Sequence, residues 1–212
     1  MSESLDIYDD NVQRIGAKDR EAVHASGDWH KAFHCWIVAE REDQPVVLFQ
    51  LRGPDKKVFP NKLDITAAGH LVQGESVEDG LRELEEELGV TVDFDRLIPL
   101  GLRTEVVQLG DVINREFDET FLLHDNRALQ EYKLQEEEVT GLAEIGIDEG
   151  QQLFGGDLDS VTARAIMLNE SGTSEEDLRV TVDSVIPRTD RYYLKVFIMA
   201  ARYFAGERYL AI

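Results

Sequence analysis

The sequence is poor in cysteine and in basic residues, and it contains no long apolar run. Its one cysteine among 212 residues excludes a framework of intrachain disulfides. No apolar stretch approaches the roughly 18 residues that a membrane span needs, and residues 1–30 are rich in charge. We therefore expect neither a membrane helix nor a secretory signal, and we expect a cytoplasmic protein.

Acidic side chains outnumber basic ones: the chain has 43 Asp and Glu against 22 Lys and Arg, a formal net charge of −21 at pH 7. This balance disfavours nonspecific binding to nucleic acids and to anionic membranes. It does not exclude a phosphorylated small molecule, because bound cations invert the local field. We therefore expect a small-molecule ligand, with no nucleic-acid or membrane partner.

The most informative segment is 69–90, GHLVQGESVEDGLRELEEELGV, in which an acidic helix follows a glycine-bearing turn. Ser76 and Asp79 form an S-x-x-D capping box, and Gly89 supplies the residue that ends the helix. The helix is therefore predicted over residues 76–88. Gly80 within it costs about 1 kcal/mol relative to alanine, which indicates tight packing or an irregular first turn.

Three glutamates of this helix, Glu83, Glu86 and Glu87, stand at i, i+3 and i+4, so their side chains share one stripe. Leucines form the stripe that faces a core. Like charges at this spacing repel, and a divalent oxygen-loving cation removes the repulsion by bridging them. The alternative is an ordinary solvated acidic face.

The segment resembles the Nudix box, G-x5-E-x7-R-E-U-x-E-E-x-G-U, where U is a bulky apolar residue. The matching residues are Gly69, Glu75, Arg82, Glu83, Leu84, Glu86, Glu87, Gly89 and Val90. The chain departs from the pattern in one place, since six residues rather than seven separate Glu75 from Arg82. The register from Arg82 onward is intact, so the departure affects only the role of Glu75.

The resemblance implies a Nudix α/β/α sandwich with a mixed sheet, and it implies chemistry. Glu83, Glu86 and Glu87 would hold Mg²⁺ or Mn²⁺, and Arg82 would pair with a carboxylate of the site. A metal-ring glutamate is one candidate general base. The others are Glu137 and Glu138 in a later acidic loop, which is equally consistent with an ordinary acidic surface.

Three cations, Arg52, Lys56 and Lys57, lie in a turn that also contains glycine and proline. Cations in such a turn can bind the distal phosphate of a substrate. The alternative is a set of solvated charges on a hairpin. The sequence leaves both interpretations open.

A second resemblance covers residues 20–145, which look like the isopentenyl-diphosphate isomerase branch of the Nudix superfamily. It includes WHKAF at 29–33, the LRG turn, KKVFP and the Gly-His before the box. In that branch a histidine-rich metal site would fall on His24, His30 and His70, with a glutamate near Glu116. Imidazoles and a carboxylate suit a transition metal, whereas the alternative is histidines that pack or form hydrogen bonds.

The isomerase places a catalytic cysteine just before that Gly-His, where this chain has DITAAGH, with Ala67 and Ala68. Cys35 lies a whole strand earlier, and a buried structural thiol is the favoured interpretation. We therefore predict hydrolysis of a diphosphate bond in a nucleoside diphosphate derivative or a related organic diphosphate. The alternatives are an isomerase-like enzyme and a non-catalytic nucleotide-binding regulator.

Periodicity along the rest of the chain predicts a mixed α/β domain. Strands are expected at 5–10 (an edge strand), 31–40, 45–52, 63–68, 90–100, 102–109, 115–123, 139–147 and 178–186. Helices are expected at 17–25 (helix or turn), 157–170 and 190–205. The chain is predicted to form one domain over residues 1–212, with a core at about 28–150, an N-terminal arm at 1–27 and a helical extension at 151–212.

The last predicted helix carries an aromatic stripe, and the aromatic residues in and after it are Tyr192, Tyr193, Phe197, Phe204 and Tyr209. A helix that covers the sheet explains this stripe simply. The alternative is a homodimer surface.

Overall fold

The structure, a computed structural model, describes residues 3–42, 44–110, 112–170 and 172–212. In chain order its strands are β1 (Ser4–Tyr8), β2 (Arg14–Asp19), β3 (Trp29–Glu40), β4 (Pro45–Arg52), β5 (Leu63–Asp64), β6 (Ala67–His70), β7 (Leu97–Leu109), β8 (Val112–His124), β9 (Val139–Gly146), β10 (Val161–Asn169) and β11 (Gly172–Val180). Its helices are α1 (Arg20–Ser26), α2 (Leu81–Leu88), α3 (Ile147–Gly155) and α4 (Tyr192–Phe204). Within the described residues, no helix is long and apolar enough to cross a membrane.

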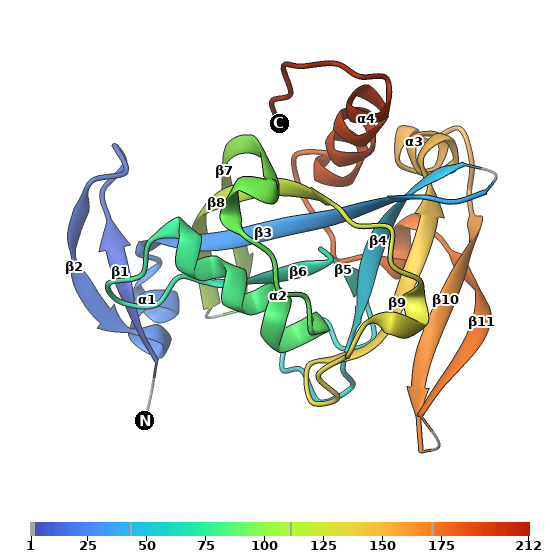
Figure 1. Cartoon of the computed structure of the whole chain (residues 1–212). Helices are drawn as coiled ribbons and strands as arrows, with labels where there is room; N and C mark the ends of the chain where they lie inside the picture. Colours follow the sequence, from blue (N-terminus) through green and yellow to red (C-terminus); the bar gives the residue numbers. More distant parts are fainter. Residues whose placement is uncertain (1–2, 43, 111, 171) are drawn as a thin grey trace.

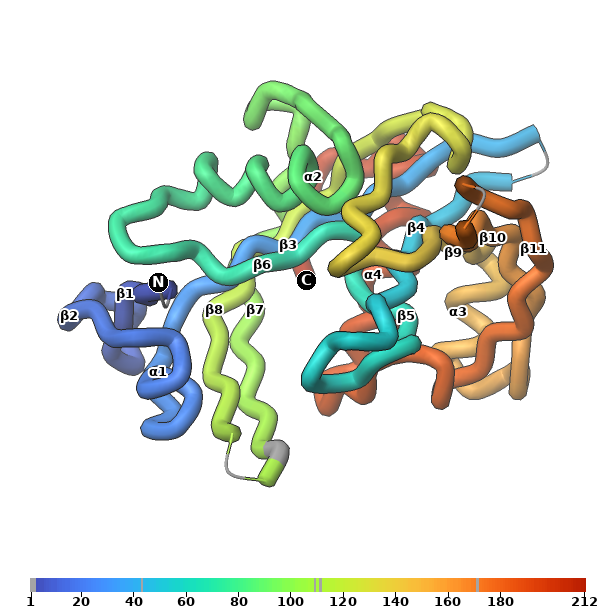
Figure 2. Tube along the Cα trace, turned by 90° about the horizontal axis from the view of Figure 1, so that it is seen from below, coloured from blue at the N-terminus to red at the C-terminus, as the bar shows by residue number. Residues whose placement is uncertain are grey.

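The strands join into one mixed sheet whose main order is β11-β10-β9-β4-β3-β1-β2. β3 pairs with β4 only at its end, through Val38 to Glu40, and with β6 and β8 over its earlier part. β5 pairs with β4, whereas β6 pairs with β3. Beyond their short paired region, β3 and β4 have therefore diverged. Glu87, near the end of the acidic helix, contacts both Gln50 of β4 and Ala68 of β6 at this divergence, while β7 and β8 project as a long hairpin (Figure 2).

Two apolar cores lie on opposite faces of β3, because alternate side chains of a strand point to opposite faces. Phe33 and Cys35 pack in the core that includes Leu84 and Leu88 of α2. The alternate residues Trp36 and Val38 pack in the core shared by α3 and α4. Figure 1 shows β3 running between α2 and α4. The expected α/β/α sandwich with a mixed sheet is therefore confirmed.

Most strands predicted from periodicity are confirmed, with shifted ends. The predictions for 90–100 and 102–109 merge into β7, which begins at Leu97 and contains a bulge between Pro99 and Gly101. The strand predicted at 178–186 is confirmed only over 178–180, because β11 covers Gly172–Val180 and Val182–Ser184 form a 3-10 turn. β1 lies between β2 and β3, so the edge strand at this end is β2, which the sequence did not predict.

The helix predicted at 157–170 is wrong, because this segment forms β10. Val161, Ala163 and Ala165 are buried, whereas the intervening Thr162 and Arg164 are exposed. This is the period-two pattern of a strand, which the helix-forming residues of the segment concealed. The extension predicted to be helical therefore contains the β10–β11 hairpin as well as α4.

Helix α3 was not predicted: a strand is expected at 139–147, and no element is expected between 147 and 157. α4 is confirmed within the predicted range 190–205. Of its aromatic residues, Tyr192, Tyr193 and Phe197 are buried in the core beneath the helix and Phe204 packs beside them, whereas Tyr209 is exposed. The aromatic stripe therefore covers the sheet.

Candidate active site

The acidic helix enters through an irregular first turn. Val77–Gly80 form a 3-10 turn, and α2 follows directly. Asp79 accepts hydrogen bonds from the Ser76 backbone N–H at 2.8 Å and from the Ser76 hydroxyl at 2.7 Å, as the capping box predicts. A Cβ on Gly80 would lie 2.5 Å from Cγ of Phe33, so only glycine allows this close approach.

The 3-10 turn accommodates the shortened spacing of the box, because it brings Arg82 back to Glu75. The Arg82 Nε donates to Glu75 Oε1 at 2.8 Å, and its Nη2 contacts Glu75 Oε2 at 3.2 Å. The same Nη2 donates to the carbonyl of His70 at 2.8 Å. The Arg82 guanidinium thus joins the turn, the helix and strand β6.

The three glutamates of the helix do not share one environment. Glu83 and Glu87 are buried against β6, whereas the Glu86 side chain is 57% exposed. A Cβ on Gly69 would lie 2.0 Å from Glu83 Oε1, so the first glycine of the box is what lets this carboxylate reach the strand. Arg82 Nη1 lies 2.5 Å from Glu83 and 3.6 Å from Glu86.

Burial disfavours the ionised forms of Glu83 and Glu87, and the charge of Arg82 offsets this for Glu83 only in part. Desolvation, followed by the charge of Glu83, raises the pKa of Glu87 to about 8. Desolvation also raises the pKa of Glu83, against the opposing charge of Arg82. Within the described residues, the hydrogen bonds that Glu87 Oε2 accepts are long: from the Ala68 backbone N–H at 3.3 Å and from the Gln50 amide at 3.4 Å. A divalent cation fits this carboxylate set, because it would supply the missing charge.

Two of the three predicted phosphate-binding cations, Arg52 and Lys56, follow Gln50, which contacts Glu87, along the end of β4 and the turn after it. Burial and the charge of Arg52 lower the pKa of Lys56, and the charge of Glu87 opposes them. Arg52 Nη1 lies 3.1 Å from Asp64 Oδ2. Lys57 is exposed on the same turn.

The acidic loop proposed to hold a general base packs against that turn. The Gly53 backbone N–H donates to the carbonyl of Glu138 at 2.9 Å. The Glu138 carboxylate forms an ion pair with Lys56, and Glu137 is exposed next to it. Both glutamates thus lie near the cations, although Glu138 already has a cationic partner.

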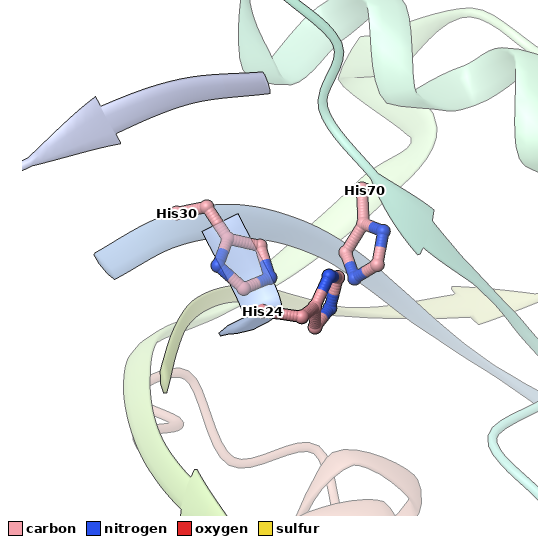
Figure 3. A group of neighbouring side chains, drawn as sticks. All are labelled: His24, His30 and His70. Atoms are coloured by element: carbon pink, nitrogen blue, oxygen red, sulfur yellow. The ribbon is translucent and has the colours of Figure 1, made fainter. Parts of the chain in front are cut away.

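The structure brings His24, His30 and His70 together from α1, β3 and β6 (Figure 3). One ligand nitrogen from each lies within 4.8 Å of the others. His24 Nδ1 lies 2.8 Å from the Arg20 carbonyl, and His30 Nδ1 lies 3.1 Å from the Asp28 carbonyl. Since a carbonyl only accepts, both rings donate through Nδ1 and keep the Nε2 lone pair for a ligand.

Glu116 on β8 completes this group. Its Oε1 lies 3.0 Å from His70 Nε2 and 3.6 Å from His30 Nε2. Burial acts to raise the pKa of Glu116, but the contacts with His30 and His70 hold it well below its usual value. His30 Nε2 is fully buried and forms no hydrogen bond with the part of the chain that the structure describes. Three imidazoles with a carboxylate oxygen as the fourth donor fit a transition metal.

The thiol chemistry of the isomerase branch has no counterpart here. Ala67 and Ala68 pair with Cys35 and His34 across β3 and β6. Cys35 is fully buried in the core beneath α2, and burial raises the pKa of its thiol. The predicted structural role of Cys35 agrees with this position.

Sequence reasoning missed the charged residues that surround the candidate site. Asp64 binds Arg52 and also Arg188, which comes from the C-terminal part of the chain. Asp64 lies on β5, shortly before strand β6 and the Nudix box, so its position in the sequence could have indicated a role near the site. Arg188 offered no signal, because 124 positions separate it from Asp64.

Comparison with known proteins agrees with this site. The model of the NUDIX domain matches residues 28–154. The chain belongs to the Nudix family. It is a hydrolase of the class that acts on phosphorus-containing anhydrides, as predicted. Nudix proteins generally use divalent cations such as Mg²⁺.

Two curated Nudix relatives illustrate the range of similarity. An uncharacterized Nudix hydrolase of Clostridium acetobutylicum is 38% identical over 192 residues, which cover 90% of this chain and 93% of the relative. An isopentenyl-diphosphate Delta-isomerase of Mycolicibacterium vanbaalenii is 32% identical over 117 residues, which cover 54% of this chain and 63% of that protein. The predicted likeness to the isomerase branch is therefore confirmed.

Solved structures support the Nudix fold. A crystal structure from Deinococcus radiodurans aligns with a TM-score of 0.55 at 19% identity and covers 73% of this chain and 90% of that one. The crystal structure of the Nudix hydrolase RenU from M. Smegmatis aligns with a TM-score of 0.51 at 14% identity and covers 97% of this chain and 98% of that one.

Proposed function

We propose that this Nudix protein hydrolyses the diphosphate bond of a nucleoside diphosphate derivative or a related organic diphosphate. We assign Mg²⁺ or Mn²⁺ binding to Glu83, Glu86 and Glu87. The observation that carries the proposal is the pair of buried carboxylates, Glu83 and Glu87, whose pKa values are raised. A protein gains nothing in stability from burying two such groups side by side, so the arrangement points to a cationic ligand.

The residues around the pair take distinct roles in this proposal. Arg82 orients the carboxylates through its contacts with Glu75 and Glu83. Arg52 and Lys56 attract the distal phosphate. When bound, the divalent cation neutralises the diphosphate and lowers the pKa of the attacking water. The proton of this water passes to a glutamate of the loop that contains Glu137 and Glu138.

We assign a second metal site to His24, His30, His70 and Glu116. The supporting observation is the buried Nε2 of His30, which forms no hydrogen bond with the described residues and lies among the other donors. Neutral imidazoles favour Zn²⁺ or Mn²⁺-like ions over Mg²⁺. Its ligands come from α1, β3, β6 and β8, whereas the carboxylates of the first site lie on α2.

A hydrolysis screen coupled to a phosphatase tests the proposed activity, because cleavage of the diphosphate bond yields phosphomonoesters from which the phosphatase releases phosphate. The panel contains nucleoside diphosphate derivatives, dinucleoside polyphosphates, isoprenoid diphosphates and thiamin diphosphate, first with Mg²⁺ and then with Mn²⁺. Glu86→Gln and Glu87→Gln should each lower turnover by about a hundredfold or more, because each removes a ligand charge. Glu85→Gln is the matched control, since Glu85 is exposed on the same helix.

Three outcomes would contradict the proposal. Wild-type turnover in both ligand variants at saturating Mg²⁺ would show that the metal is held elsewhere. Binding of a nucleotide without hydrolysis of any substrate would indicate a regulator. Formation of dimethylallyl diphosphate from isopentenyl diphosphate would indicate the isomerase alternative.

A further inference from the structure

The segment 185–191, which leads into α4, begins beside strand β5, which lies before the Nudix box in the sequence. Leu63 of β5 forms a parallel bridge with Val185, and the Ile186 backbone N–H donates to the Leu63 carbonyl at 3.1 Å. This segment lies outside residues 28–154, which the NUDIX model matches. It nevertheless reaches the neighbourhood of the proposed phosphate-binding cations.

Arg188 in this segment is held between two carboxylates. Its Nη2 lies 3.1 Å from Asp64 Oδ1 on β5, and its Nη1 forms an ion pair with Glu105 on β7. The Arg188 side chain is only 10% exposed. Burial at this depth makes the geometry of the pair sensitive to the loss of either partner.

Asp64 shares its two oxygens between two guanidinium groups. Oδ1 binds Arg188, while Oδ2 binds Arg52 Nη1 at 3.1 Å. Arg52 also donates through Nη2 to the Val58 carbonyl at 3.2 Å. If Arg188 did not bind Oδ1, the whole carboxylate charge of Asp64 would act on Arg52. Arg52 would then present a weaker field to a phosphate.

We propose that Arg188 is a positioning residue of the diphosphate-binding site, which acts through Asp64 on Arg52. The C-terminal segment is thereby part of the substrate site. This inference rests on the proposed function in one respect, since it takes Arg52 to bind a substrate phosphate. The inference concerns the affinity for a diphosphate, so a binding measurement can test it in the absence of turnover.

The test measures binding of methylenediphosphonate, a non-hydrolysable diphosphate, by calorimetry in the presence of Mg²⁺. Arg188→Met combined with Glu105→Gln removes the buried ion pair and leaves no unpaired charge at either position, and Arg103, which loses its contact with Glu105, keeps Asp118 and Asp190 as partners. We expect its Kd to rise by about tenfold, the size typical of coupled charged contacts. Arg188→Lys keeps the charge but cannot contact both carboxylates with a planar fork, so we expect a rise of about threefold.

Arg191→Met is the matched control. Arg191 belongs to the same segment, and its Nη2 contacts the Gly155 carbonyl at 3.4 Å. Its Kd should equal that of the parent. For any substrate found in the screen, the Arg188 variants should raise KM and leave kcat within about twofold, because the residue acts on binding and not on the reacting atoms.

A double-mutant cycle tests the route through Arg52. In an Arg52→Lys background the Arg188 variants should weaken binding no further, since both changes affect one contact. Circular dichroism checks that each variant folds. If the variant with Arg188→Met and Glu105→Gln does not fold, the Kd of Arg188→Lys tests the inference. Parent-like binding in Arg188→Lys, additive losses, or no diphosphonate binding by the parent would overturn the inference. Binding that responds to Arg188 without any hydrolysis would refute the proposed activity alone.

Discussion

The stability of the metal-free protein should depend on Glu87 in a way that can be measured. In the metal-free state, burial and the neighbouring Glu83 raise the pKa of Glu87 to about 8 from the ordinary value of 4.5. Glu87→Gln replaces an acid that resists ionisation by a neutral group of the same shape. The amide oxygen can still accept from the Ala68 backbone N–H, which lies 3.3 Å from the carboxylate.

The sign and size of the effect follow from the two pKa values. The folded state holds the Glu87 proton more tightly than the unfolded chain, so this group stabilises the fold fully below about pH 4.5. The contribution is lost as the pH rises to about 8. At pH 7 the loss amounts to roughly 3 kcal/mol, since a tenfold change in proton affinity is worth about 1.4 kcal/mol. For a chain of this length that corresponds to a shift in Tm of roughly 6–12 °C.

Thermal unfolding of chelator-treated protein at several pH values between 4.5 and 8.5 measures this difference. The free energy of unfolding of Glu87→Gln should exceed that of the parent by an amount that grows with pH. Saturating Mg²⁺ should reverse the order, because the cation stabilises only the carboxylate that binds it. Parallel pH profiles for parent and variant would refute the reasoning, and Glu85→Gln should follow the parent throughout.

Two further predictions concern the histidines and the thiol. After mild chelation, elemental analysis of the parent should find a retained transition metal that His30→Ala and His70→Ala lose; equal metal in all three would show that these side chains only pack. Burial lowers the pKa values of His24 and His70, so the metal should be retained to a lower pH than the ordinary histidine pKa of about 6.5 suggests. Cys35→Ser should leave hydrolysis unchanged, since the thiol is buried in the apolar core beneath α2; a loss of activity without a loss of stability would contradict its structural role.

The acidic helix and its surroundings could be predicted because their signals are local. The capping box, the helix-ending Gly89 and the glutamate spacing all lie within 22 consecutive residues. The shortened spacing before Arg82 left the role of Glu75 undecided. The structure places Glu75 against Arg82, because a 3-10 turn replaces one turn of α-helix. Spacing alone does not reveal such a change of helix type.

The charged network beyond the helix could not be predicted, because it depends on tertiary contacts. Arg103, Glu105 and Asp118 read as polar positions of ordinary strands, yet all three are buried. Arg103 pairs with Glu105 and Asp118, and also with Asp190 near the start of α4. Their burial follows from the C-terminal segment that covers them. No local pattern in β7 or β8 indicates that cover.

Strand β6 joins the two proposed metal sites, and this affects how the histidine variants must be interpreted. The side chain of His70 belongs to the histidine group, while its carbonyl accepts a hydrogen bond from Arg82 at 2.8 Å. The adjacent Gly69 admits Glu83. A change at His70 can therefore disturb the helix carboxylates as well as the second metal. His30 lies on β3 and has no contact with Arg82 among the described hydrogen bonds. A loss of hydrolysis in His30→Ala thus reports on the second metal alone, whereas an additional loss in His70→Ala measures the displacement of β6.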